Sequence, residues 1–215
     1  MLIRYDTRDA LMTGLADRVA TELRALLAEQ GQTSLSVPGG STPRPFFEAL
    51  READLDWANV TICLNDERMV PESSDRSNTA LVKAHLLQSK AAAAQFLNLL
   101  ETPTDIADHL PLGVLVTGMG ADMHTASLFP DAPQLLDALS NDAPPVLTIS
   151  TPSGGEDRVT LTAPVLRQAR YKHVLIAGAD KLAAYETALM AKTDSEAPIR
   201  VVLEADPAAH VHYTE

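Results

Sequence analysis

The sequence is short of cysteine, of aromatic residues and of long apolar runs. One cysteine among 215 residues cannot form a disulfide within the chain, which is typical of proteins from a reducing compartment. No apolar run approaches the roughly 20 residues that cross a bilayer. The opening residues MLIRYDTRDALM carry acids where a secretory signal is apolar. We therefore expect a cytoplasmic protein that does not bind membranes.

Basic side chains are also scarce. The chain has 17 Lys and Arg against 29 Asp and Glu, a formal net charge of −12, and its basic residues are dispersed. This charge argues against nucleic acid as a partner. Apolar residues make up 46% and charged residues 21%, with no linker or repeat. Residues 1–215 are therefore expected to form a single domain, a monomer or homodimer, that acts on a small molecule.

Alternation of strand and helix patterns predicts the fold class. Helical spacing begins at residue 11 and ends near Gly31, and a second helix is expected to carry Phe46 and Leu50 after a proline-rich start. Further helices are expected near 76–87, 164–169 and 180–191, strands at 34–37, 59–64, 112–117, 146–150, 158–162, 173–177 and 199–203, and a strand or helical turn at 95–100. The pattern predicts an α/β protein with an open, mainly parallel sheet and helices on both faces.

Two glycines and two hydroxyls lie between a predicted strand and a predicted helix, in the sequence Pro38-Gly39-Gly40-Ser41-Thr42-Pro43. The glycines let backbone N–H groups approach an anion, and Ser41 and Thr42 add hydroxyl donors. The stretch is therefore a candidate phosphate site, although it lacks the lysine of a Walker motif. A tight turn in which Ser or Thr caps the next helix is the alternative.

Charged residues directly follow the strand predicted at 59–64, in the sequence Asn65-Asp66-Glu67-Arg68. Ligands of open α/β sheets bind at the carboxyl ends of the strands. Arg68 suits a phosphate or carboxylate there, and Asp66 suits proton transfer or hydrogen bonding. A solvated acidic turn with a local ion pair is the alternative.

A histidine follows the strand predicted at 112–117, in the sequence GMGADMHTASLFP, which spans residues 118–130. His124 is a candidate general base because an imidazole titrates near neutral pH, and Asp122 stands close enough to orient it. A loop histidine bonded to a backbone carbonyl is the alternative.

Other isolated residues carry weaker signals. Arg158 begins one predicted strand and Lys181 follows another, so each is either a surface charge or a contact for an anionic ligand. The remaining histidines are expected to be structural or on the surface. No third ligand accompanies His210 and His212, so no metal site is expected. Cys63 stands inside an apolar strand and is expected to pack rather than react.

In this order, these stretches resemble the 6-phosphogluconolactonase family, whose fold relatives are glucosamine-6-phosphate deaminases and ribose-5-phosphate isomerases. The matching pieces are GGSTP at 39–43, NDERMVP at 65–71 with SN at 77–78, GMGADMHTASLFP at 118–130, RVTLT at 158–162 and GADK at 178–181. TASLFP after the histidine and Arg in DER are the lactonase forms, since deaminases differ at both places. The resemblance implies a Rossmann-like fold of the deaminase and isomerase type.

The resemblance also implies hydrolysis of 6-phospho-D-glucono-1,5-lactone in the oxidative pentose phosphate pathway, without a metal or another cofactor. His124 would take a proton from water, and Asp122 would position the loop or the histidine. Asp66 and Arg68 would lie near the ring or the carbonyl oxygen, with Arg68 stabilising the oxyanion. The 6-phosphate would be held by Gly39, Gly40, Ser41, Thr42, Arg158 and Lys181.

One departure from the family pattern stands beside the histidine, where Met123 replaces the usual glycine. If this position requires a positive φ, a methionine costs roughly 1–2 kcal/mol. If the glycine only makes room, Met123 narrows the pocket. Met123 keeps open a sugar-phosphate-binding module without catalysis, and the shared fold keeps open an amino-sugar phosphate deaminase or isomerase.

Overall fold

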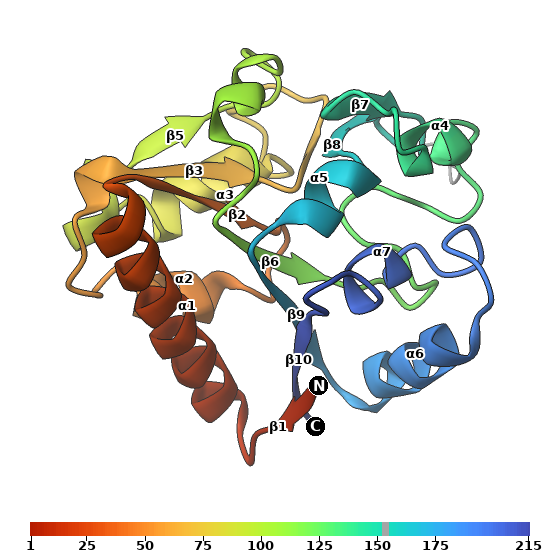
Figure 1. Ribbon diagram of the computed structural model, residues 1–215, viewed down its shortest axis with the longest axis horizontal. Helices are drawn as coiled ribbons and strands as arrows, with labels where there is room; N and C mark the ends of the chain where they lie inside the picture. Colours follow the sequence, from red (N-terminus) through yellow and green to blue (C-terminus); the bar gives the residue numbers. More distant parts are fainter. Residues whose placement is uncertain (152–154) are drawn as a thin grey trace.

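The computed structural model describes residues 1–151 and 155–215 and has a parallel sheet at its centre. Its strands are β1 (Leu2–Arg4), β2 (Thr33–Val37), β3 (Val60–Leu64), β5 (Gln95–Leu97), β6 (Val114–Gly118), β9 (Tyr171–Ala177) and β10 (His210–Thr214). They are arranged in the order β1-β10-β9-β6-β2-β3-β5 (Figure 1). Every pairing between neighbours is parallel, which confirms the predicted sheet.

Helices cover both faces of this sheet, as predicted. One hydrophobic cluster contains α1 (Arg8–Gln30), α2 (Arg44–Leu50) and α3 (Asn78–His85). The other contains α4 (Leu135–Leu139), α5 (Ala163–Gln168), α6 (Ala179–Met190) and α7 (Arg200–Leu203). Short 3-10 helices lie at Trp57–Asn59, Ser89–Ala93 and Asp105–His109. Strand β6 separates the clusters, because Val114 and Val116 pack into the first and Leu115 into the second.

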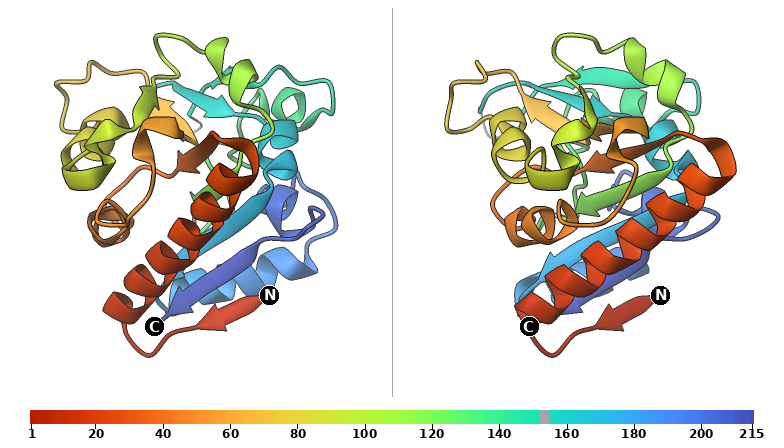
Figure 2. Two further views of the ribbon diagram at one scale, coloured as in Figure 1. Left: turned by 60° about the vertical axis from the view of Figure 1, so that its left-hand side comes forward. Right: turned by 90° about the vertical axis from the view of Figure 1, so that its left-hand side faces the viewer.

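The first helix follows directly from its sequence. The Thr7 side chain accepts a hydrogen bond from the Ala10 N–H and caps the start of α1. Gly31 ends the helix in the left-handed conformation, with φ of 75°, and its N–H donates to the Leu27 carbonyl. Figure 2 shows α1 lying along one face of the sheet.

A second, antiparallel sheet lies beside the main one. It consists of β4 (Asp66–Arg68), β8 (Arg158–Leu161) and β7 (Val146–Ile149), in the order β4-β8-β7. The sequence predicted strands at the last two places, but as part of the mainly parallel sheet, and it placed residues 66–68 after a strand without assigning them to one. The register of this sheet pairs Arg68 with Arg158, two residues 90 positions apart. It thus brings together two of the predicted site cations.

The C-terminal part of the fold differs from the prediction. Residues 199–203 were expected to form a strand, but α7 occupies 200–203. A short apolar run fits a buried helix as well as a buried strand, and its period does not distinguish them. The strands that complete the sheet are β10 and β1, which the sequence reading missed. None of the helices in residues 1–151 and 155–215 combines the length and apolar character needed to cross a bilayer.

Candidate active site

A cavity of about 540 Å³ opens at the carboxyl ends of β2, β6 and β9. This is the edge at which open α/β sheets bind ligands. The cavity collects all of the motif stretches singled out from the sequence. Its lining includes Arg8, Gly39, Gly40, Thr42, Asp66, Arg68, Asn78, Thr117, His124, Phe129, Arg158 and Lys181.

His124 and Asp122 form a close pair at this cavity. The Asp122 Oδ1 lies 2.5 Å from the His124 Nδ1 and also accepts from the His124 backbone N–H at 3.3 Å. The hydrogen bond from His124 lowers the pKa of the Asp122 carboxyl, so that group is anionic. His124 lines the cavity, whereas Asp122 does not. An anionic partner at Nδ1 fixes the proton there and leaves the Nε2 lone pair for water or substrate.

The loop that carries His124 has unusual backbone geometry. Met123 adopts φ of 65°, so the position requires the left-handed conformation that glycine adopts easily. Its side chain packs against the hydrophobic core and does not line the cavity. Met123 therefore adopts a positive φ, and its side chain does not narrow the cavity. Gly120 is required by contact, since a Cβ there would lie 2.1 Å from the His124 Nδ1.

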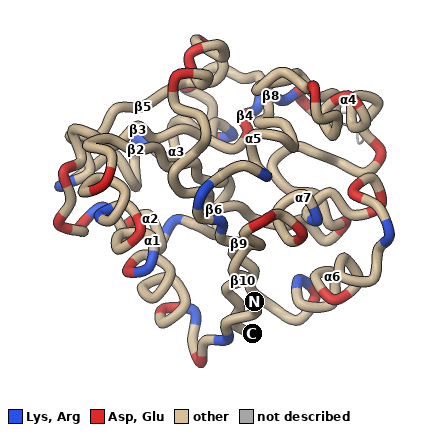
Figure 3. The backbone as a smooth tube through the Cα atoms, viewed as in Figure 1, with Lys and Arg blue, Asp and Glu red and all other residues tan. Residues whose placement is uncertain are grey.

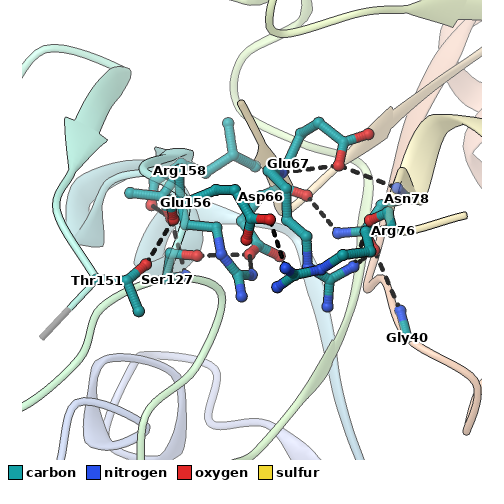
Figure 4. A network of polar contacts seen from close by, with 12 residues as sticks. Gly40, Asp66, Glu67, Arg76, Asn78, Ser127, Thr151, Glu156 and Arg158 are labelled. Carbon is teal, nitrogen blue, oxygen red and sulfur yellow. Dashed lines mark hydrogen bonds and ion pairs between the residues drawn. The ribbon is translucent and has the colours of Figure 1, made fainter. Parts of the chain in front are cut away.

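Asp66 is buried, and its side chain is occupied by protein partners. Its Oδ2 accepts from the Ser127 Oγ at 2.5 Å and from the Arg158 Nη1 at 3.1 Å (Figure 4). Of the two roles predicted for Asp66, this geometry favours hydrogen bonding over proton transfer. The carboxylate ties Arg158 to the TASLFP segment, to which Ser127 belongs.

Two guanidinium groups lie on the same wall of the cavity. Arg68 donates from Nη1 to the Arg76 carbonyl at 2.5 Å and to the Asn78 Oδ1 at 3.1 Å. Burial lowers the pKa of Arg68, and the positive charge of Arg158 lowers it further. The Nε atoms of Arg68 and Arg158 are buried and have no hydrogen-bond partner in the described part of the chain. Both guanidinium groups line the cavity, where their positive charge suits an anionic ligand.

The glycine stretch forms another wall of the cavity. Gly40 has φ of 83°, and its N–H donates to the Asn78 Oδ1 at 3.3 Å. Thr42 lines the cavity with Gly39 and Gly40, but Ser41 is exposed and does not line it. A loop-to-helix turn is present as well, although α2 has no side-chain cap.

Cations from helix starts complete the cavity. Lys181 lies in the first turn of α6 and lines the cavity, as does Arg8, the first residue of α1. Figure 3 shows Lys and Arg dispersed over the rest of the fold. Sequence reasoning missed Arg8, because it lies far from any motif, and Asn78, which appeared only as part of the SN pair. Among residues 1–151 and 155–215, no three or more His, Cys, Asp or Glu side chains are grouped to hold a metal ion.

Residues that were expected to stay outside the site do so. Cys63 is buried in β3, and burial raises the pKa of its thiol to about 12, so it packs rather than reacts. His85 is paired with Glu48 at 3.0 Å, away from the cavity.

Comparison with known proteins places these features in one family. The family model described as glucosamine-6-phosphate isomerases/6-phosphogluconolactonase matches residues 6–211. A 6-phosphogluconolactonase of Pseudomonas aeruginosa is 44% identical over 92% of this chain and 88% of the relative. One of Rhizobium meliloti is 40% identical over 93% and 91%.

Solved structures agree with these sequence matches. The crystal structure of a 6-phosphogluconolactonase from Shewanella baltica superposes with a TM-score of 0.95 at 32% identity and covers 100% of this chain and 97% of that one. A monomeric glucosamine-6-phosphate deaminase shares the fold, with a TM-score of 0.79 at 15% identity and coverage of 100% and 97%. The chain therefore belongs to the glucosamine-6-phosphate isomerase/6-phosphogluconolactonase family.

Proposed function

We propose that this protein is a cytoplasmic enzyme that hydrolyses 6-phospho-D-glucono-1,5-lactone to 6-phospho-D-gluconate in the oxidative pentose phosphate pathway. Relatives that bear the name of this activity match nearly the whole chain at 40% identity or more. The observation that carries the proposal is the His124–Asp122 pair, whose histidine lines a cavity walled by cations and backbone donors.

His124 acts as the general base. A water molecule gives a proton to Nε2 while its oxygen bonds to the lactone carbonyl carbon. Asp122 holds the proton at Nδ1 and stabilises the imidazolium that forms. The ring C–O bond of the tetrahedral intermediate then breaks, and the imidazolium returns its proton to the departing ring oxygen. The acid product loses a proton to water, so each turnover releases one proton.

Arg68 is the group assigned to the carbonyl oxygen. Arg68 lines the cavity, so its guanidinium offers charged N–H donors to an oxygen that becomes negative in the intermediate. Asp66 positions Arg158 rather than reacting. A positioned base contributes ~10²–10⁴ to a rate, which is a large share of what an already reactive lactone requires.

The 6-phosphate is assigned to the glycine stretch and the cations near it. Gly39 and Thr42 supply backbone and hydroxyl donors there, Gly40 forms the turn, and Lys181 and Arg158 supply charge. Ser41 does not line the cavity, so its hydroxyl is not assigned to the phosphate. Replacing Lys181 by alanine is expected to raise KM about tenfold or more, the loss of one charge-assisted contact. Lys90→Ala is the matched control, since Lys90 is exposed and lies outside the cavity.

The test is the initial rate of proton release from freshly generated 6-phosphoglucono-δ-lactone, with and without the protein. Acceleration over spontaneous hydrolysis is the expected result. The same protein is also incubated with glucosamine-6-phosphate, and release of ammonia is measured. Ammonia release without lactone hydrolysis would replace the lactonase by a deaminase. Binding of 6-phosphogluconate without either reaction would leave a non-catalytic sugar-phosphate-binding module.

A further inference from the structure

The side-chain amide of Asn78 joins three segments of the cavity wall. Its Oδ1 accepts from the Gly40 N–H at 3.3 Å and from the Arg68 Nη1 at 3.1 Å. Its Nδ2 donates to the Asp66 carbonyl at 3.1 Å. The residue is 2% exposed, so these bonds form away from bulk water (Figure 4). One oxygen thus holds a donor of the glycine stretch and a donor of Arg68 at a fixed separation.

The glycine stretch is shaped to receive this amide. A Cβ built on Gly39 would lie 2.1 Å from the Asn78 Cγ and Nδ2. Any side chain at position 39 therefore displaces Asn78, whatever ligand the loop binds. The Asn78 amide packs directly against the Gly39 backbone, and the contact requires a glycine at position 39.

A buried carboxylate fixes Asn78 from the other side. Glu67 accepts from the backbone N–H groups of Asn78 at 2.9 Å and Thr79 at 2.6 Å, and from the Ser77 Oγ at 3.3 Å. It also accepts from the Arg68 N–H at 2.7 Å. Because Glu67 and Arg68 are neighbours in β4, this carboxylate attaches the start of α3 to the strand that carries Arg68. The Asn78 backbone is therefore held, and its amide has little freedom to follow a moving loop.

We propose that Asn78 is a positioning residue that sets the distance between the phosphate-binding loop and the Arg68 guanidinium, and so makes the site selective for a phosphorylated sugar acid or lactone. This rests on the proposed function, which assigns the phosphate to the loop. The Gly40 N–H is already bonded to Asn78, so the N–H groups of Gly39 and Thr42 are left for the phosphate. Loss of the amide releases the loop from Arg68, and a ligand that bridges the two loses part of its preorganised binding energy.

The test is calorimetric binding of 6-phosphogluconate and of gluconate, its analogue without phosphate, to the wild type and to Asn78→Ala. The expected result is a Kd for 6-phosphogluconate that rises about tenfold, with much less change for gluconate. Asn59→Ala is the matched control. Asn59 also donates a side-chain hydrogen bond, to the Asp56 carboxylate, but it is exposed and does not line the cavity, so its loss leaves both Kd values unchanged.

If Asn78 had a purely structural role, its loss would change the Kd values of both ligands equally or would change neither. Either result overturns the proposal. If Asn78→Ala does not fold, Asn78→Ser replaces it, because one hydroxyl cannot span both donors and the same selective loss is expected. The double variant Gly39→Ala/Asn78→Ala supplies a second readout. The two changes break one contact, so the double variant should bind no more weakly than the worse single variant. A double variant whose Kd rises by the product of the two single effects would contradict the coupling.

Failure of this inference and failure of the proposed function are distinguishable. Binding of 6-phosphogluconate does not depend on turnover. A wild type that binds the phosphorylated acid but does not hydrolyse the lactone removes the lactonase and leaves the test of Asn78 intact. An active wild type whose selectivity survives Asn78→Ala removes only the role of Asn78.

Discussion

Two of the histidine–carboxylate pairs in this fold have nearly the same length but differ in what surrounds them. The His124–Asp122 pair has an Nδ1–Oδ1 distance of 2.5 Å, and its side chains are 30% and 51% exposed. The His173–Glu22 pair has an Nε2–Oε2 distance of 2.6 Å, and its side chains are 0% and 10% exposed. The same chemical pair, at almost the same distance, thus stands once in an open cavity and once inside the protein.

The two pairs also differ at the second nitrogen of the histidine ring. The His173 Nδ1 lies 3.0 Å from the His212 Nε2, and the His212 Nδ1 lies 2.8 Å from the Tyr5 hydroxyl. This chain of bonds connects α1, β9 and β10 with the segment after β1, and it engages both nitrogens of each ring. In contrast, the His124 Nε2 has no partner in the described part of the chain. The two pairs thus differ in a free ring nitrogen and in access to water, the two features that the proposed general base requires.

The buried hydrogen bonds that run from Glu22 through His173 and His212 to Tyr5 make the free energy of unfolding depend on pH. Burial, helped by the charges of His173, Arg18 and His210, lowers the pKa of His212 to about 3, from the ordinary value of 6.5. Between these values the unfolded chain binds a proton that the folded chain does not. The free energy of unfolding therefore falls as pH falls from 6.5 towards 3, by up to about 1.4 kcal/mol per pH unit from this group.

Denaturant unfolding at pH 7, 6, 5 and 4 measures this slope. His212→Gln removes the titrating group, so the variant should lose stability less steeply with acid than the wild type. An identical slope in both proteins would show that His212 does not stay neutral on folding, and the contrast between the two pairs would be lost.

Replacing Glu22 by leucine should affect stability and not chemistry. The change leaves the His173 Nε2 without a partner inside the protein, at an expected cost of about 1–3 kcal/mol in the free energy of unfolding. Glu29→Leu, on the same helix, is the control, because the exposed pair of Glu29 with Arg170 contributes at most about 1 kcal/mol. A fall in kcat for folded Glu22→Leu would mean that the buried pair takes part in catalysis.

Replacing Asp122 by asparagine should have the opposite pattern. Without the carboxylate, the imidazolium loses its stabilising partner, and kcat is expected to fall about tenfold, or about 1.4 kcal/mol. Stability should change little, since Asp122 is half exposed. Asp131→Asn, another exposed aspartate near the loop, is the control for the assay. Full activity in Asp122→Asn would show that His124 needs no anionic partner.

Replacing Met123 by glycine is expected to have the smallest effect. Relief of the left-handed strain contributes about 1–2 kcal/mol, but the entropy of glycine in the unfolded chain costs about 0.5–1 kcal/mol, and the core loses a contact. The net change in unfolding free energy should be within about 1 kcal/mol, with KM unchanged. A severalfold change in KM would show that the Met123 side chain reaches the substrate.

Most of the site could be predicted from the sequence, because its residues follow strands. The carboxyl ends of β2 and β6 meet at one edge of the sheet, which brings Gly39 and His124 to the same cavity. Lys181 follows β9 in the same way. The positive φ required at Met123 was one of two interpretations, and only the backbone conformation decided between them.

What could not be predicted depends on contacts between distant segments. The antiparallel sheet that pairs Arg68 with Arg158 depends on register, and the local sequence does not encode the partner. Arg8 reaches the cavity through the packing of α1, and no motif marks it. The hydrogen bond between His173 and His212 could not be predicted either, because the two residues lie on separate strands and were expected only to be structural or on the surface. The strand predicted at 199–203 was wrong because a five-residue segment with four apolar residues fits either element.

We expect His124, and not the buried His173–Glu22 pair, to carry the chemistry. The most direct measurement is the initial rate of proton release from 6-phosphoglucono-δ-lactone by His124→Ala, beside the wild type and Glu22→Leu at a temperature where all three are folded. The account predicts that His124→Ala loses ~10²–10⁴ of the acceleration, whereas Glu22→Leu keeps the wild-type kcat. A folded His124→Ala protein that hydrolyses the lactone at the wild-type rate would contradict it.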